Sequence, residues 1–231
     1  MVRDFQFKSG EVLPELKLHY QTLGAPNRNA KGQVTNAIIV LHGTSGSSGQ
    51  FLNYSFAGVL FGPGQPLDAS RYFIVLPDGI GHGQSSKPSD GLHARFPHYD
   101  YDDMVRAHYL LLTQHLRINH LRLVMGTSMG GMHSWVWGET YPDFMDALMP
   151  LASLPVQIAG RNRMMRRMII DSIRTDPEWK RRWIASTVMH ELAHQMAPIA
   201  TNDALVRCGG SAPTGKCSAK EAERIGYDAV H

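Results

Sequence analysis

Three short apolar runs constrain the fold of this chain more than any other sequence feature. They cover residues 37–41, 72–76 and 121–125, and each has the length of a single strand. Apolar runs without regular polar alternation are typical of parallel strands that are buried on both faces of a sheet. A stretch with apolar residues at helical spacing, 101–116, separates the second run from the third. This alternation predicts an α/β fold with a doubly wound, mostly parallel sheet.

Local patterns predict the elements around this sheet. Polar and apolar residues alternate over 4–24, as in an antiparallel edge pair. A helix is predicted from Met129 to about Tyr141, where Pro142 closes it. Residues 147–152 are interpreted as another short central strand, although a proline is unfavourable inside a sheet.

Composition divides the chain into three predicted parts. Residues 1–155 form the α/β core, residues 156–200 a helical cap-like segment, and residues 201–231 an irregular tail. The second part has apolar residues at helical spacing, whereas the third is rich in Gly, Ser, Thr, Ala and Lys and has no strand-like run. One α/β domain with a helical insertion is the expectation for 231 residues.

The charge and hydropathy of the chain argue against several classes of protein. Its net charge of +3 is too small for the dense basic face of a nucleic-acid-binding protein. No apolar run reaches the ~20 residues that a membrane-spanning helix needs. One basic segment is either a solvated helix face or a guide for an anionic substrate: Arg161, Arg163, Arg166, Arg167, Lys180, Arg181 and Arg182. We expect a small-molecule substrate and no cofactor, and leave the oligomeric state open, with a dimer as one option.

The sequence leaves the cellular compartment open. Its first residues lack the apolar stretch of a signal peptide, so the chain is cytoplasmic, or periplasmic or secreted if a leader has been removed. Cys208 and Cys217 bracket a loop and form either a disulfide, in an oxidising compartment, or two unpaired thiols.

A serine motif follows the third apolar run. Residues 126–130 read Gly-Thr-Ser-Met-Gly, which has the form G-x-S-x-G. A predicted strand before the motif and a predicted helix after it are the context of a nucleophile elbow. The turn lifts the hydroxyl of Ser128 above the sheet at a helix N-terminus, where the helix dipole favours developing negative charge. Ser128 is therefore the predicted nucleophile.

A glycine-containing loop follows the first apolar run. Such a loop can present a backbone N–H toward the nucleophile, and with the N–H of Met129 it completes an oxyanion hole. By position we assign the loop donor to Thr44. We interpret His42 as a scaffold of this loop rather than as the catalytic base. Asp78 and His82, in the glycine-rich turn after the second run, are interpreted as hydrogen-bonding groups within that turn.

These motifs together resemble the α/β-hydrolase superfamily, and within it the branch that includes homoserine O-acetyltransferase. The segments that carry the resemblance are residues 9–14, 20–24, 128–132 and 162–179. The resemblance implies an α/β-hydrolase fold with a helical cap and a serine that forms an acyl-enzyme. It leaves hydrolysis of an ester or amide and acyl transfer to an alcohol as alternatives. The loop at 78–85 is more similar to that of hydrolases in the superfamily, which favours hydrolysis.

The C-terminal part of the chain departs from this family. The family places its catalytic Asp and His after two further strands, and the sequence predicts no such strands, so the cap is expected to be partial and the last strands missing. Asp203 and His231 keep the family order Ser, Asp, His and are the candidate acid and base. A catalytically impaired or truncated hydrolase-fold protein is an alternative reading.

A competing motif lies in the same region. His190, Glu191 and His194 form H-E-x-x-H, which on a helix places two imidazoles on one face to bind zinc, with the glutamate as base. The candidates for a third ligand, Glu221 and Glu223, lie in a polar segment. A zinc peptidase is therefore a further alternative to the serine enzyme.

Overall fold

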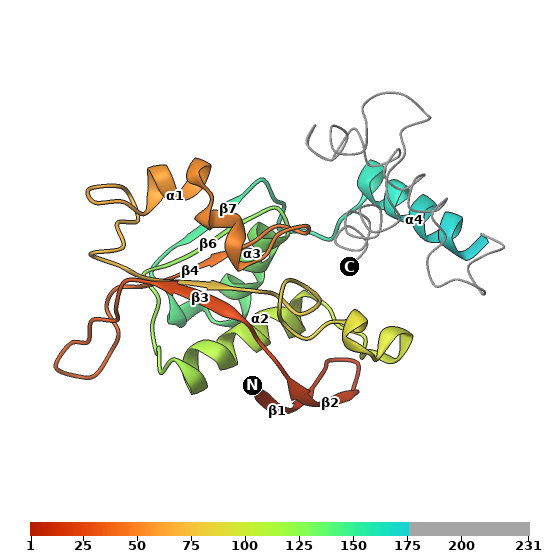
Figure 1. The fold of residues 1–231 in the computed structure, drawn as a ribbon, viewed down its shortest axis with the longest axis horizontal. Helices are drawn as coiled ribbons and strands as arrows, with labels where there is room; N and C mark the ends of the chain where they lie inside the picture. The colour runs from red at the N-terminus through yellow and green to blue at the C-terminus, as the bar shows by residue number, and fades with distance from the viewer. Residues whose placement is uncertain (176–231) are drawn as a thin grey trace. The chain divides into compact units, whose positions relative to one another are not determined.

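The computed structural model describes residues 1–175 of the chain (Figure 1). The chain divides into two units, Met1–Val156 and Gln157–His231, which we describe separately. Among the described residues, the first unit holds both sheets and helices α1 to α3, and the second holds helix α4. The finer division into core, cap-like segment and tail stays a prediction.

A five-stranded sheet forms the centre of the first unit. Its strand order is β3-β5-β4-β6-β7, and all neighbours are parallel except β3 and β5. The strands are β3 Tyr20–Leu23, β4 Ala37–Leu41, β5 Phe73–Pro77, β6 Leu123–Thr127 and β7 Leu148–Leu151. Because β4 lies between β5 and β6 and precedes both in sequence, the chain winds outward from β4 in both directions. The predicted doubly wound, mostly parallel sheet is confirmed.

Helices cover both faces of this sheet (Figure 1). Helix α1, Tyr54–Leu60, lies on one face over a core that includes Ile38. Helices α2, Tyr101–Leu110, and α3, Met129–Thr140, pack on the other face over a core that includes Ile39. Neighbouring residues of β4 thus enter opposite cores, and both are buried, which is why this strand is apolar throughout.

The predicted elements agree with the observed ones in kind and differ at some ends. The strands predicted at 72–76 and 121–125 begin at Phe73 and Leu123. The helix predicted over 101–116 is α-helical to Leu110 and continues as a π-helical turn. The π-helical turn covers Leu111–His115. The described 3-10 segments are Ser48–Leu52, Pro88–Asp90, His93–Arg95 and Pro142–Phe144.

One expectation about the N-terminal strands is wrong. The alternating segment 4–24 is not one edge pair. It contains a separate hairpin of β1, Val2–Gln6, and β2, Val12–Leu16, and then β3, which leaves the hairpin to pair with β5. The strand predicted at 147–152 is observed as β7, which is the last strand in the order that residues 1–175 form; its central position stays a prediction. Pro150 has no N–H to give to a second neighbour.

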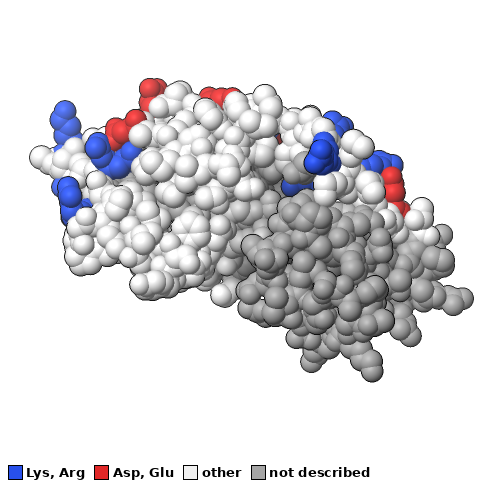
Figure 2. Space-filling model, turned by 90° about the horizontal axis from the view of Figure 1, so that it is seen from above, with Lys and Arg blue, Asp and Glu red and all other residues white. Residues whose placement is uncertain are grey.

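Helix α4, Gly160–Thr175, is the described element of the second unit and confirms the helical pattern up to that residue. Ile169 is buried, and Arg167 donates a hydrogen bond to Asp171 one turn later, at 2.8 Å. No helix within residues 1–175 is long and apolar enough to cross a membrane. Figure 2 shows one face of the molecule, on which Lys and Arg side chains are scattered among acidic and uncharged ones.

Candidate active site

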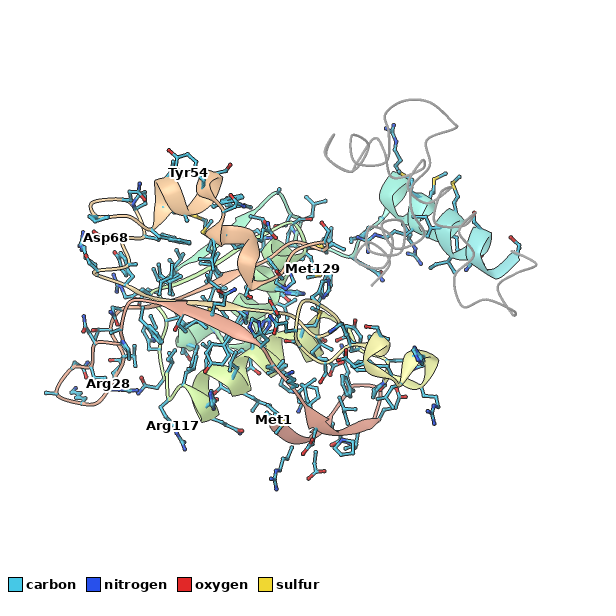
Figure 3. All side chains as sticks on the ribbon, viewed as in Figure 1. Met1, Arg28, Tyr54, Asp68, Arg117 and Met129 are labelled. Carbon is cyan, nitrogen blue, oxygen red and sulfur yellow. The ribbon has the colours of Figure 1, made fainter. Side chains whose placement is uncertain are left out.

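Ser128 lies at the junction of β6 and α3. Strand β6 ends at Thr127 and α3 begins at Met129, which is labelled in Figure 3, so Ser128 is the turn between them. Its backbone has φ 52° and ψ −112°, a conformation that residues other than glycine rarely adopt. Its N–H donates to the carbonyl of Leu151 at 2.9 Å, which helps to hold the turn. A strained and exposed serine at this position has the geometry of the predicted nucleophile elbow.

Gly126 and Gly130 make this turn sterically feasible. A Cβ atom at Gly126 would lie 2.1 Å from the carbonyl oxygen of Gly130. A Cβ atom at Gly130 would lie 2.1 Å from the carbonyl oxygen of Leu41, at the end of β4. Real Cβ atoms essentially never come within 3.0 Å of such atoms. Both glycines of the motif are therefore required by close backbone contacts rather than by the reaction itself.

The loop that follows β4 lies against Ser128. A Cβ atom at Gly43 would lie 3.7 Å from the Cβ atom of Ser128, which is ordinary van der Waals contact. The carbonyl of Gly43 accepts hydrogen bonds from Nδ1 of His42 at 2.8 Å and from the N–H of Gly46 at 2.9 Å. In a trans peptide the C=O and the following N–H point in opposite directions. The N–H of Thr44 therefore points away from both donors.

Two backbone N–H groups beside Ser128 have no acceptor within the described part of the chain. Neither Thr44 nor Met129 donates through its backbone N–H to any of residues 1–175. Met129 is the first residue of α3, and the first N–H groups of a helix have no partner inside it. Both residues predicted as oxyanion donors thus have the unpaired amide that this role needs.

His42 holds the loop in place and is unavailable as a base for Ser128. Its Nε2 accepts the N–H of Gly79 at 2.9 Å, so the proton of the neutral ring lies on Nδ1 and is donated to the carbonyl of Gly43. Burial lowers the pKa of His42 to about 4, and the nearby His82 acts in the same direction. The ring is therefore neutral at pH 7, with both nitrogens bound to the backbone, as expected for a scaffold residue.

The glycine-rich turn after β5 is built around Asp78 and His82. The carboxylate of Asp78 accepts hydrogen bonds from the backbone N–H groups of Ser48 and Gln84 and from Nδ1 of His19. Burial alone would raise the pKa of Asp78, but these hydrogen bonds outweigh it and hold the pKa below its ordinary value. The Nε2 of His82 lies 2.8 Å from the carbonyl oxygen of Thr44, which ties this turn to the loop after β4.

No described side chain is hydrogen-bonded to the hydroxyl of Ser128. Within residues 1–175 no bond joins this hydroxyl to a histidine or a carboxylate, and no cluster of three or more potential metal ligands occurs. The candidate acid and base, Asp203 and His231, lie outside the described residues. So do all the residues of the H-E-x-x-H motif and its potential third ligands, and both cysteines: His190, Glu191, His194, Glu221, Glu223, Cys208 and Cys217.

Sequence patterns missed one residue that joins the two halves of this site. The side chain of Gln50 accepts the N–H of Gly43 at 2.9 Å and donates to Oγ1 of Thr127 at 3.3 Å. No local motif marks this glutamine, because both of its partners are brought to it only by the fold. Its contacts occupy the N–H of Gly43, whereas the N–H of Thr44 has no acceptor among the described residues.

The fold and the elbow define an α/β-hydrolase. The family described as "alpha/beta hydrolase fold" matches residues 36–197, and the chain belongs to this family. A probable acyltransferase from Methanothermobacter thermautotrophicus is 33% identical over 180 residues, covering 78% of this chain and 54% of the relative. A homoserine O-acetyltransferase from Methanosphaera stadtmanae is 34% identical over 198 residues, covering 78% of this chain and 38% of the relative. The chain thus spans about half the length, or less, of these relatives.

Solved structures with the same fold include both hydrolases and acetyltransferases. The acetyl esterase MekB matches 98% of this chain and 66% of its own, with a TM-score of 0.72 and 26% identity. An acetylester hydrolase from Corynebacterium glutamicum matches with a TM-score of 0.76 and 21% identity, over 99% of this chain and 68% of its own. A homoserine O-acetyltransferase from Bacillus anthracis matches with a TM-score of 0.71 and 22% identity, over 99% and 69%. The resemblance seen in the sequence is confirmed at the level of the superfamily and of this branch.

Proposed function

We propose that this chain carries a serine acyl-transfer site whose nucleophile is Ser128. The Ser128 oxygen attacks the carbonyl carbon of a small ester or amide, and its proton passes to a base. The bond to the leaving alcohol or amine then breaks as that group takes up the proton, which leaves an acyl-enzyme. Water attacks the acyl-enzyme in the second half of the reaction, so the products are an acid and the free serine.

The backbone amides of Thr44 and Met129 form the oxyanion hole of this proposal. The oxygen of the attacked carbonyl becomes negatively charged, and two preorganised N–H groups stabilise that charge without rearrangement of solvent. The observation that carries the proposal is the elbow geometry of Ser128, with the Gly43–Thr44 loop packed against it. The N-terminus of α3 adds a favourable dipole at the same point.

The acid and base of the proposal are Asp203 and His231. A serine hydroxyl is a weak nucleophile until a positioned base removes its proton. His42, the histidine nearest to Ser128 in the loop, is engaged on both ring nitrogens and cannot take this role. Asp203 and His231 follow Ser128 in the order that α/β-hydrolases use, and they are the residues whose substitution tests the assignment.

A second candidate function is transfer of the acyl group to an alcohol acceptor. It is favoured by the homoserine O-acetyltransferases to which this chain is 32–35% identical. The elbow and oxyanion hole are common to both reactions, and they differ only in which hydroxyl attacks the acyl-enzyme. Turnover of an activated acetyl ester with and without homoserine separates them, because a transferase forms O-acetylhomoserine at the expense of free acetate.

Covalent labelling tests the proposed site directly. The full chain is treated with a fluorophosphonate, which phosphonylates an activated serine with loss of fluoride, and the adduct is located by peptide mass spectrometry. One adduct on Ser128 that is absent from Ser128→Ala is the expected result. If the folded parent stays unlabelled while ester turnover is also absent, the chain is a hydrolase-fold protein without a working serine site.

A further inference from the structure

The side chain of Gln50 lies between the loop after β4 and the nucleophile elbow. Its Oε1 accepts the N–H of Gly43 at 2.9 Å, and its Nε2 donates to Oγ1 of Thr127 at 3.3 Å. Thr127 directly precedes Ser128, and Gly43 directly precedes Thr44. One amide group therefore joins the two backbone segments that carry the nucleophile and one oxyanion donor.

The backbone around Gln50 holds this side chain in one place. Its N–H donates to the carbonyl of Ser47 at 2.9 Å, and its own carbonyl accepts Nδ2 of Asn53 at 2.5 Å. A Cβ atom at Gly46 would lie 2.0 Å from Oε1 of Gln50, so the amide passes through space that only glycine leaves free. The glutamine is half-buried, which limits competition from water for its hydrogen bonds.

The contact with Gly43 removes one backbone N–H of the loop from the set of possible oxyanion donors. The N–H of Gly43 is used by Gln50, and the carbonyl of Gly43 is used by His42 and Gly46. Hydrogen bonds thus hold both peptide planes that meet at Gly43: Gln50 holds the His42–Gly43 plane, and His42 and Gly46 hold the Gly43–Thr44 plane, which carries the Thr44 N–H. Without Gln50 the His42–Gly43 peptide would be free to rotate at the glycine, and its unpaired N–H would be a second, misdirected donor at the site.

We infer that Gln50 is a positioning residue that sets the oxyanion-hole loop against the nucleophile elbow. The inference rests on the proposed function, since an oxyanion hole has a role only in acyl transfer. The side chain of Gln50 is hydrogen-bonded to Gly43 and Thr127 and not to Ser128 itself. It acts through the N–H of Gly43, the residue before Thr44, on one side and through the hydroxyl of Thr127 on the other.

Glutamine is the side chain that suits this place. It offers an acceptor and a donor at the end of a chain long enough to reach both partners. Glutamate in its ionised form keeps the acceptor for Gly43 but loses the donor for Thr127, and it brings a negative charge close to the developing oxyanion. Protonated glutamic acid restores a donor and removes the charge. Gln50→Glu should therefore show a pH dependence of its own, in addition to that of the parent.

The experiment measures the rate of fluorophosphonate labelling at saturating probe, and the probe concentration for half-saturation, for the full-length parent and three variants. Gln50→Ala removes both hydrogen bonds, and Gln50→Glu in its ionised form removes the one to Thr127. Gln21→Ala is the matched control, because Gln21 is bonded to Ser48 in the same 3-10 segment at 3.0 Å but touches neither Gly43 nor Thr127. Thermal denaturation checks that each variant is folded, and amide hydrogen exchange by NMR follows Gly43 and Thr44.

We expect Gln50→Ala to lower the saturating rate about 10-fold to 100-fold with little change in the half-saturating concentration, since a direct oxyanion donor is worth about 10²–10³. The ratio of the Gln50→Glu rate to the parent rate should decrease as the pH rises through the pKa of the new carboxyl group, because the ionised form lacks the donor for Thr127 and carries a negative charge. The Gly43 amide should exchange faster in Gln50→Ala, and Gln21→Ala should behave like the parent.

Two outcomes overturn the inference while the proposed function stands. They are labelling of Gln50→Ala at the parent rate, and losses of equal size in Gln50→Ala and Gln21→Ala. An unlabelled parent overturns the proposed function instead. The inference is then decided by hydrogen exchange: unchanged protection of Gly43 in Gln50→Ala overturns it, and faster exchange confined to Gly43 and Thr44 supports the hydrogen bonds on which it rests.

Discussion

The stability of this protein is expected to fall steeply as the pH drops below about 6.5, because histidines are buried in the neutral form. His108, in α2, is buried, and neither ring nitrogen has a hydrogen-bond partner within residues 1–175. Burial lowers its pKa from 6.5 to about 4, and nearby His42 and His82 lower it further while Asp78 opposes them. His133, whose ring centroid lies 6.4 Å from that of His108, has its pKa lowered for the same reasons.

The size of the effect follows from the difference between the folded and unfolded pKa of His108. The unfolded chain takes up the proton near pH 6.5 and the folded chain only near pH 4, so unfolding is favoured by acid across this window. The stabilisation is complete above pH 6.5 and is lost as the pH falls toward 4. At ~1.4 kcal/mol per pKa unit, His108 contributes about 3 kcal/mol over the whole window and about 2 kcal/mol between pH 7 and pH 5.

Urea denaturation of the parent and of His108→Leu at pH 7 and pH 5 measures this contribution. Leucine removes the titrating group and the two unpaired nitrogens while filling most of the space. The variant is expected to lose about 2 kcal/mol less of its unfolding free energy than the parent on going to pH 5. His98→Gln serves as control, because the side chain of His98 is 88% exposed and contacts Glu11 at the surface, so its replacement leaves the buried histidines in place. Equal pH dependence in parent and His108→Leu would refute the reasoning.

Three further predictions concern the elbow and the residues outside the described part. Gly130→Ala is expected to cost about 3 kcal/mol or more, because its Cβ would lie 2.1 Å from a carbonyl oxygen, whereas Gly49→Ala, with a nearest atom at 3.6 Å, should cost less than about 1 kcal/mol. Equal melting temperatures of the two variants would contradict the close packing of the elbow. His231→Ala is expected to slow fluorophosphonate labelling about 10²-fold to 10⁴-fold, and an unchanged rate would assign the base elsewhere. Elemental analysis of the purified chain is expected to find no stoichiometric zinc, and zinc that is lost on His190→Ala would assign a metal site to the H-E-x-x-H motif.

The sequence predicts the centre of this fold well because its signals are local. A strand such as Ala37–Leu41 is buried on both faces, so all of its residues are apolar and this apolar run predicts a central strand. The elbow at Ser128 is also marked locally, by glycines that the close backbone contacts require. The pairing of β3 with β5, apart from the hairpin of β1 and β2, was not predicted, because strand order depends on pairing between distant segments.

The parts of the site that sequence reasoning missed are contacts between segments that the fold brings together. Gln50 forms hydrogen bonds with Gly43 and Thr127, and no spacing of residues in the sequence predicts them. The buried His108 and His133 were likewise not singled out, because a histidine on an amphipathic helix gives no sign of whether it faces a core. Pairing and burial of polar groups are decided by three-dimensional packing, and only the structure reports them.

The central claim, that Ser128 is a nucleophile, is tested most directly by the stoichiometry and site of fluorophosphonate labelling of the folded chain at pH 7 to 8. The elbow at the N-terminus of α3 and the unpaired amides of Thr44 and Met129 predict one phosphonyl group per chain, on Ser128, and none on Ser128→Ala. A folded parent that takes up no label, or that is labelled on another residue with Ser128 untouched, would contradict the claim.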